Sequence, residues 1–336
     1  MRELPTIEEP VEVLELTAGE IGALGEEVRA LVAERNAVVL AHNYQVPEIQ
    51  DLADFVGDSL ALSRQAAVTD AELIVFCGVH FMAETASILA PAKTVLIPDL
   101  EAGCSLAESI TAAELRNWKL RYPDAVVVMY VNTSAEVKAE TDYCCTSGNA
   151  VQVVERVRAD RGADVQILFG PDMWLGSYVE LVTGKPMILW PGECHVHAGI
   201  RPEDIDRVRS ERPGSELLIH PECACAPECV EYVAAGEIED GRVHMLGTGG
   251  MLRYVSDHPG GDFIVATETG MLHPLRKAAL HARLTPANPK AVCKYMKTIT
   301  LPKLRDALRD RKFEVKVPAD VATRARLPIE RMVAIG

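Results

Sequence analysis

The chain alternates short apolar runs with longer stretches in which apolar residues follow helical spacing. The first such stretch, 20–34, places its apolar residues on one face of a helix. Short apolar runs then recur, bounded by glycine, proline and polar residues, as buried strands are. These runs lie at 38–41, 54–56, 73–77, 95–97, 126–131, 142–145, 165–169, 187–190, 217–219, 243–246, 263–266 and 284–285. Continuous apolar strands that alternate with helices predict parallel sheets covered by helices on both faces.

The pattern of strands and helices occurs three times along the chain. Residues 47–60 (PEIQDLADFVGDSL) and 135–148 (AEVKAETDYCCTSG) align without gaps, and a looser third copy begins at Pro227. Each copy would supply about four strands and the helices between them. We therefore predict an α/β fold of three similar small parallel-sheet domains that surround a common centre.

The repeat also divides the chain. We predict an N-terminal tail at 1–19, and a first domain made of 20–103 together with 293–336. The second domain would be 104–193 and the third 194–292. The segment after 293 has helical spacing and is expected to pack back on the first domain.

Composition narrows the class of protein. The 336 residues carry a net charge of −15 with no basic run, which argues against a nucleic-acid partner. No apolar stretch is long enough to span a bilayer, and the N-terminus lacks a signal pattern, so we predict a cytoplasmic protein with no membrane partner. The nine cysteines are then expected to be metal ligands, buried apolar residues or catalytic thiols rather than disulfides.

One cysteine follows the last predicted strand of each copy. Cys104, Cys194 and Cys293 follow one another at nearly equal, domain-sized intervals. One such cysteine alone is more often a buried apolar residue, but the repeated position of all three favours metal ligation. Three thiolates are too few for a closed zinc site, and they suit a [4Fe–4S] cluster with one open iron that acts as a Lewis acid. A second group, Cys223, Cys225 and Cys229, leaves a zinc or redox role open.

Polar residues gather where the predicted strands end, and in open parallel sheets ligands bind at that edge. If the three domains face inward, these loops line one cavity. The turns at 146–149 and 248–250 each open a predicted helix, where backbone N–H groups and hydroxyls bind anions. Ordinary N-capping would explain either turn alone, but two equivalent turns favour a phosphate or carboxylate ligand.

The order of several short motifs resembles that of the quinolinate synthase family, from about residue 20 to the last predicted helix. The motifs are His42-Asn43-Tyr44-Gln45, GDSL at 57–60, Gly103-Cys104, MYVNT at 129–133, Thr146-Ser147 with Asn149, Gly192-x-Cys194-x-x-His197, His220-Pro221-Glu222-Cys223, TGGM at 248–251, Thr267-Glu268 with Gly270, and Cys293 followed by Tyr295-Met296-Lys297. Three positions depart from the family. Ala287 and Lys290 stand where some members have further cysteines, and Lys294 stands where proline is usual.

The resemblance implies an enzyme of NAD biosynthesis that condenses iminoaspartate with dihydroxyacetone phosphate to quinolinate, phosphate and water. It implies three α/β domains arranged with pseudo-threefold symmetry around a central active site. It also implies a [4Fe–4S] cluster bound by Cys104, Cys194 and Cys293. A transient contact with the enzyme that produces iminoaspartate is a further expectation.

On this basis we assign roles to the polar residues. Ser147 and Thr248 are expected to bind the phosphate. Glu222, whose pKa we expect burial to raise, is the predicted general base, because the matching loops of the other two copies carry Asn43 and Asn132. The remaining assignments are His220 in support of the base, Tyr44 and Tyr130 as proton shuttles, and His42, Ser59, Asn132, His197 and Glu268 as ligands of the dicarboxylate.

Two other classes of function stay open on the residues alone. A different [4Fe–4S] hydro-lyase acting on a small dicarboxylate would not need the paired phosphate turns. A non-catalytic iron–sulfur sensor would not need acid–base groups at the strand ends.

Overall fold

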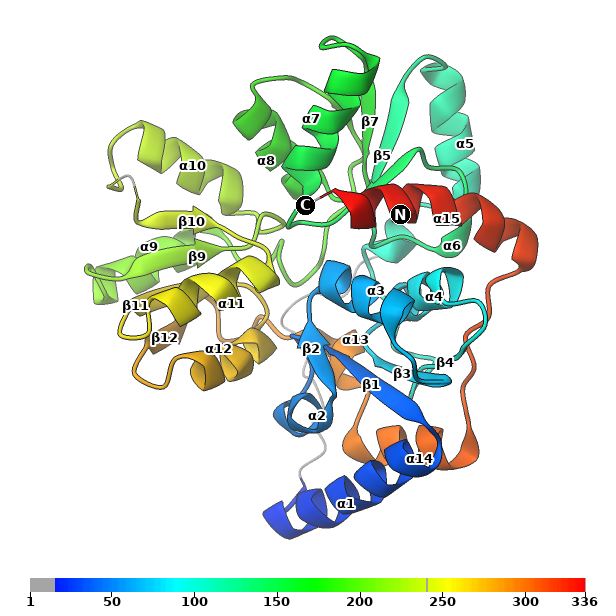
Figure 1. The fold of residues 1–336 in the computed structure, drawn as a ribbon. Coiled ribbons are helices and arrows are strands. Elements are labelled where there is room, and N and C mark those ends of the chain that lie inside the picture. Colours follow the sequence, from blue (N-terminus) through cyan, green and yellow to red (C-terminus); the bar gives the residue numbers. More distant parts are fainter. Residues whose placement is uncertain (1–15, 240, 336) are drawn as a thin grey trace.

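The computed structural model describes residues 16–239 and 241–335. Its strands form three four-stranded sheets with the orders β2-β1-β3-β4, β6-β5-β7-β8 and β10-β9-β11-β12, and all pairings between these strands are parallel. The strands are β1 Ala37–His42, β2 Phe55–Gly57, β3 Leu73–Cys77, β4 Thr94–Leu96, β5 Val126–Tyr130, β6 Tyr143–Cys145, β7 Ile167–Gly170, β8 Ile188–Leu189, β9 Glu216–Ile219, β10 Val243–Met245, β11 Asp262–Ala266 and β12 Arg283–Pro286. The sheet order is the same in each unit, so the predicted fold of three similar α/β domains is confirmed (Figure 1).

Helices connect and cover these strands. They are α1 Ala18–Glu34, α2 Pro47–Leu52, α3 Ser59–Val68, α4 His80–Leu89, η1 Ala107–Ser109, α5 Ala112–Arg121, α6 Ala135–Lys138, α7 Ala150–Arg161, α8 Met173–Thr183, α9 Pro202–Glu211, α10 Ala226–Ala234, α11 Thr248–Asp257, η2 Thr269–Met271, α12 Leu272–Ala278, α13 Lys294–Lys297, α14 Leu301–Asp310 and α15 Ala319–Ala334. Strands β3 and β5 are buried along their whole length because helices cover both faces of the sheets, which explains their unbroken apolar sequence.

The first two units share a side-chain contact that reflects the sequence repeat. The Asp54 carboxylate accepts the backbone N–H of Val39 at 2.8 Å, and the aligned Asp142 accepts that of Val127 at the same distance. In the third unit the N–H of Leu217 donates to a backbone carbonyl instead. The looser third copy in the sequence therefore corresponds to a real difference in how its first strand is held.

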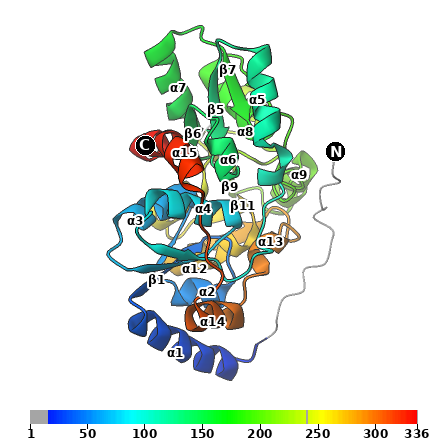
Figure 2. The ribbon, with the colours of Figure 1, turned by 90° about the vertical axis from the view of Figure 1, so that its right-hand side faces the viewer.

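The segment after the third unit returns to the other two. Helix α14 packs against α1 and β3 of the first unit. Helix α15 contacts α3 and α4 of the first unit as well as α6 and β6 of the second, and it lies between these units in both views (Figures 1 and 2). The predicted domain boundaries remain predictions. Helix α1 begins at Ala18 behind the capping residue Thr17, and the rest of the predicted tail, 1–15, lies outside the described residues.

None of the helices in the described parts of the chain has the length and apolar character needed to cross a membrane.

Candidate active site

The carboxyl ends of the strands meet at one cavity, whose empty space out to its mouth is about 710 Å³. Every site residue predicted from the sequence lines it: His42, Tyr44, Ser59, Cys104, Tyr130, Asn132, Ser147, Cys194, His197, His220, Glu222, Thr248, Glu268 and Cys293. The structure thus brings the whole set together from all three units, while the role of each residue remains a prediction.

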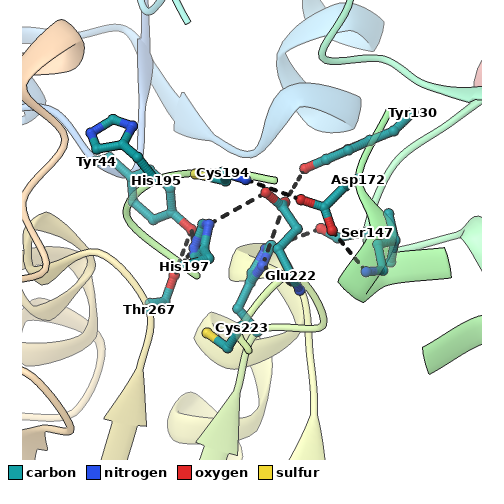
Figure 3. Close-up of polar contacts among 12 residues, drawn as sticks. Tyr44, Tyr130, Ser147, Asp172, Cys194, His195, His197, Glu222, Cys223 and Thr267 are labelled. Carbon is teal, nitrogen blue, oxygen red and sulfur yellow. Dashed lines mark hydrogen bonds and ion pairs between the residues drawn. The ribbon is translucent and has the colours of Figure 1, made fainter. Parts of the chain in front are cut away.

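A buried carboxylate on the third unit is the most connected group of the cavity. Glu222 follows β9 and is 2% exposed. The phenol of Tyr130, from β5 of the second unit, donates a hydrogen bond to its Oε1. His197 Nδ1 lies 3.3 Å from Glu222 Oε2, and His220 Nδ1 lies 3.5 Å from Oε1. Figure 3 shows the carboxylate between Tyr130 and His197.

The prediction that the pKa of Glu222 is raised is wrong. Burial alone would raise it, but the nearby imidazoles of His197 and His220, with the hydrogen bond from Tyr130, lower this pKa to about 2. The carboxylate is therefore ionised throughout the neutral range. The sequence argument counted the loss of water around the carboxylate and could not count the partners that replace it.

The two tyrosines and His220 are neutral groups in this environment, whereas His197 is a cation. Burial works against that charge, but Cys194 and Glu222 raise the pKa of His197 well above its usual value. Burial and the Glu222 carboxylate raise the pKa of both Tyr44 and Tyr130 well above the usual range, so both remain phenols. Burial, with a contribution from the nearby imidazole of His197, lowers the pKa of His220 to about 3. Tyr130 can therefore donate a hydrogen to Glu222, and the unprotonated His220 ring can accept one from a neighbour.

A second chain of polar contacts reaches the first unit. The Tyr44 hydroxyl lies 2.6 Å from Thr267 Oγ1 and 3.2 Å from His197 Nε2, and the threonine oxygen is 3.0 Å from the same nitrogen. The rings of His197 and His220 stack with their centroids 4.4 Å apart. Hydrogen-bonding groups from all three units are therefore linked around Glu222 (Figure 3).

The two predicted anion turns lie side by side. A Cβ on Gly247 would be 3.0 Å from Ser147 Oγ and 3.3 Å from the backbone nitrogen of Gly148. Neither α7 nor α11 receives a side-chain cap, so the hydroxyls of Ser147 and Thr248 are not used for capping. They contact His220 Nε2 at 3.1 Å and Asn43 Nδ2 at 2.8 Å, respectively. The capping interpretation therefore fails for these two hydroxyls.

The three cysteines predicted as ligands face the same cavity as free thiols. Burial raises the pKa of Cys104 to about 12 and those of Cys194 and Cys293 to about 11. A neighbouring thiol raises two of these pKa values further, that of Cys104 through Cys293 and that of Cys194 through Cys104. Thiols of this kind become thiolates when a metal supplies positive charge.

Comparison with known proteins supports the resemblance. The family model described as Quinolinate synthetase A protein matches residues 26–334. The chain belongs to the quinolinate synthase family. A quinolinate synthase of Thermus thermophilus is 54% identical over 314 residues, which cover 94% of this chain and 98% of the relative. Those of Mycobacterium sp. (strain KMS) and Mycobacterium tuberculosis (strain CDC 1551) are 53% and 52% identical over 92% of this chain and 91% and 88% of theirs.

Membership of the quinolinate synthase family confirms that the chain is an enzyme of NAD biosynthesis that catalyses a condensation, and it implies a metal cofactor. The donor set fits one, since one free thiol from the end of each unit reaches a common cavity. Cys194, His197 and Glu222 also place a ligand atom each within 4.8 Å of one another. A single metal ion bound by these three residues would leave the other two cavity thiols without a metal. In an iron–sulfur cluster, each of the three thiols would bind its own iron. Cys223, Cys225 and Cys229 are fully buried and are not among the residues that line the cavity.

Several groups at the site were given no role from the sequence. Thr267 was noted only as part of a motif, and His195 was given no role. Its Nδ1 lies 2.8 Å from Ser105 Oγ and its ring meets the edge of Tyr295. Asp172 is fully buried beside Cys194. Its position directly after a third strand, like that of Glu268, was the signal that could have identified it.

Proposed function

We propose that this chain condenses iminoaspartate with dihydroxyacetone phosphate to give quinolinate, one phosphate and two waters. The observation that carries the proposal is the buried Glu222–Tyr130 pair, which shares a cavity with three thiols and two hydroxyl turns. The overall reaction needs no external electron donor or acceptor, because it consists of proton shifts, imine formation and eliminations. A site for it needs acid–base groups, an anion site and an electrophile, and the cavity offers residues for each.

Cys104, Cys194 and Cys293 would hold a [4Fe–4S] cluster, one iron to each thiolate. The fourth iron, which has no cysteine, would supply Lewis-acid chemistry toward a substrate oxygen. The other cavity residues must then bind the two substrates and move protons.

The triose phosphate would bind with its phosphate at the two adjacent turns. Ser147 and Thr248 present hydroxyls there, and the starts of α7 and α11 present backbone N–H groups. The dicarboxylate would lie across the cavity. Asn132 supports that placement, because its Oδ1 is buried and accepts no hydrogen bond within the described residues, so a ligand donor would satisfy it. The other proposed ligands are His42, Ser59, His197 and Glu268.

Proton transfer would centre on Glu222. As an ionised carboxylate it can accept a proton from the carbon next to a carbonyl or imine group. Tyr130 already donates to this carboxylate, so the phenol can pass a proton onward to a departing hydroxyl. Tyr44, bonded through Thr267 to His197, would perform the same task at the other side of the cavity. His220, unprotonated and 3.1 Å from Ser147 Oγ, joins the base to the phosphate end.

The two alternative functions explain less of the cavity. A hydro-lyase acting on a dicarboxylate leaves the paired hydroxyl turns without a ligand. An iron–sulfur sensor leaves the buried carboxylate and its tyrosine without a use. We also propose a cytoplasmic location, and a transient contact with the enzyme that releases iminoaspartate, because a free imine hydrolyses in water.

The test is an anaerobic assay with the cluster-loaded enzyme, chemically generated iminoaspartate and dihydroxyacetone phosphate. Quinolinate and inorganic phosphate should appear in a one-to-one ratio. The matched control is Glu222→Gln, which should retain iron and produce little of either. Phosphate release without quinolinate, or no turnover by fully loaded protein, would overturn the assignment.

A further inference from the structure

A buried aspartate holds the second cysteine ligand loop. Asp172 lies between the end of β7 and the start of α8 and is fully buried. Its Oδ1 accepts the N–H of Leu175 at 2.8 Å and so caps α8. Its Oδ2 accepts the backbone N–H of Cys194 at 3.3 Å, a contact drawn in Figure 3. One carboxylate therefore joins the start of a helix to the peptide that carries the thiol.

A buried glutamate does the same in the third unit. Glu268 Oε1 accepts the backbone N–H of Cys293 at 3.1 Å and lies 3.1 Å from Lys297 Nζ. Its Oε2 accepts the N–H of Gly270 at 2.6 Å. Lys297 also donates to the backbone carbonyl of Tyr44. The glutamate thus connects the third ligand with the segment that positions a predicted proton shuttle.

Backbone contacts show that the two carboxylates occupy equivalent positions. In each unit, a residue just after the third strand donates its N–H to the carbonyl two residues before the cysteine. The three contacts are His80 to Ala102 at 2.7 Å, Met173 to Gly192 at 2.8 Å, and Thr269 to Ala291 at 2.9 Å. The residues that precede these donors are Val79, Asp172 and Glu268. The same backbone contact therefore recurs in all three units. The residue before the donor is apolar in the first unit and carries a carboxylate in the second and third.

The first ligand loop is held in another way. Ser105, next to Cys104, contacts His195, next to Cys194, at 2.8 Å. The loop of Cys104 therefore depends on the loop of Cys194, which Asp172 fixes. In both carboxylates, each oxygen already accepts a protein N–H.

We propose that Asp172 and Glu268 are positioning residues, which orient Cys194 and Cys293 toward the cavity by accepting the amide N–H of each cysteine. The proposal rests on the cofactor assignment made above, and it gives Glu268 a structural task in addition to its predicted contact with substrate. Residues that orient metal ligands in this way commonly change metal retention by about tenfold or more when they are substituted.

The first test follows cluster retention in the full-length enzyme. Asp172→Asn and Glu268→Gln keep the size of each side chain but replace one acceptor oxygen with an NH₂ group. The matched control is Asp142→Asn, which removes a similar carboxylate–amide bond at the opposite end of the second sheet. After addition of a chelator, the cluster absorbance should decay about tenfold faster in the two test variants than in wild type. In the control variant it should decay at the wild-type rate. The electron paramagnetic resonance spectrum of the reduced cluster should change in the test variants alone.

The second test needs no cluster, so it separates this proposal from the proposed function. The iron-free full-length protein is treated with iodoacetamide, and alkylation at each cysteine is followed by mass spectrometry. Asp172→Asn should speed the labelling of Cys194 more than that of Cys293, and Glu268→Gln should do the reverse. Equal acceleration at both cysteines, or none, would overturn the positioning role. Wild-type protein that binds no cluster, together with the expected labelling pattern, would overturn the cofactor assignment and leave the positioning role intact.

Discussion

Tyr130 on the second sheet donates a hydrogen bond to Glu222 on the third, so the central acid–base pair of the cavity spans two units. Tyr130 is the last residue of β5, and Glu222 lies in the loop after β9; these are the first strands of their units. The pair exists only when the units are assembled. Its chemistry is therefore a property of the threefold arrangement rather than of any one unit.

Replacing the members of this pair should separate their roles. Glu222→Gln keeps the shape of the side chain but removes the proton acceptor, and turnover should fall by about 10²-fold or more. Tyr130→Phe removes only the hydroxyl and should cost less, because the carboxylate remains. Both variants should retain the iron–sulfur spectrum. Near-normal turnover in Glu222→Gln would move the base to His220.

Substitution of cysteines should divide them into two groups. Cys104→Ala, Cys194→Ala and Cys293→Ala should each abolish the cluster, because each removes one of three thiols that reach the cavity. Cys225→Ala, which changes a buried cysteine outside the cavity, should keep full iron content. Iron and sulfide analysis of the anaerobically purified proteins measures this. Retention by Cys194→Ala and loss by Cys225→Ala would reverse the ligand assignment.

The hydroxyl turns should control affinity for the phosphorylated substrate. Ser147→Ala and Thr248→Ala should each weaken binding of dihydroxyacetone phosphate by about 1.5 kcal/mol, the usual value of a hydrogen bond to a charged group. Iron content should not change. Isothermal titration with the triose phosphate and with the unphosphorylated triose provides the comparison. Equal affinity of wild type and the double variant for the phosphorylated compound would exclude both turns.

A glycine between these turns offers an independent test. A methyl group on Gly247 would meet the Ser147 hydroxyl at 3.0 Å, so Gly247→Ala should displace it without removing any hydrogen-bonding group. The backbone there is in the extended region, which alanine adopts without strain. We expect weaker phosphate binding with little change in unfolding temperature. Gly260→Ala is the control, since a methyl group there meets no atom within 4 Å.

The strands and the repeat could be read from the sequence because burial on both faces leaves an unbroken apolar run. The aligned aspartates Asp54 and Asp142 even make the same backbone contact. The cavity residues could be predicted because parallel strands bring their carboxyl ends to one edge. Contacts between units could not be predicted from the sequence. Ser105 and His195 lie 90 residues apart and meet only through the packing of ligand loops.

Electrostatic detail was also beyond the sequence. The expectation for Glu222 rested on burial, whereas its pKa is set by the imidazoles that come from separate turns of the chain. The position of Asp172 after a third strand could be read from the sequence, but its task, holding the amide of Cys194, is defined by a distance and not by residue type.

The acid sensitivity of the folded protein should depend on His42. Burial, together with the cation of Lys297, lowers the pKa of this histidine from its ordinary 6.5 to about 3. Between these values the unfolded chain binds a proton that the folded protein excludes, so stability is complete above pH 6.5 and falls as the pH decreases. The loss should be about 1.4 kcal/mol per pH unit from this one group.

The measurement is denaturant unfolding of the iron-free full-length protein from pH 7.5 to 5, with His42→Asn as the comparison. The amide oxygen of asparagine can still accept the N–H of Tyr44, which His42 Nδ1 accepts at 3.2 Å. The variant should therefore fold, yet its unfolding free energy should fall less steeply below pH 6.5 than that of wild type. The difference in slope should correspond to about one proton. Equal slopes would mean that His42 gains its proton in the folded protein as easily as in the unfolded chain, and that the cavity is more open to water than its buried side chains indicate.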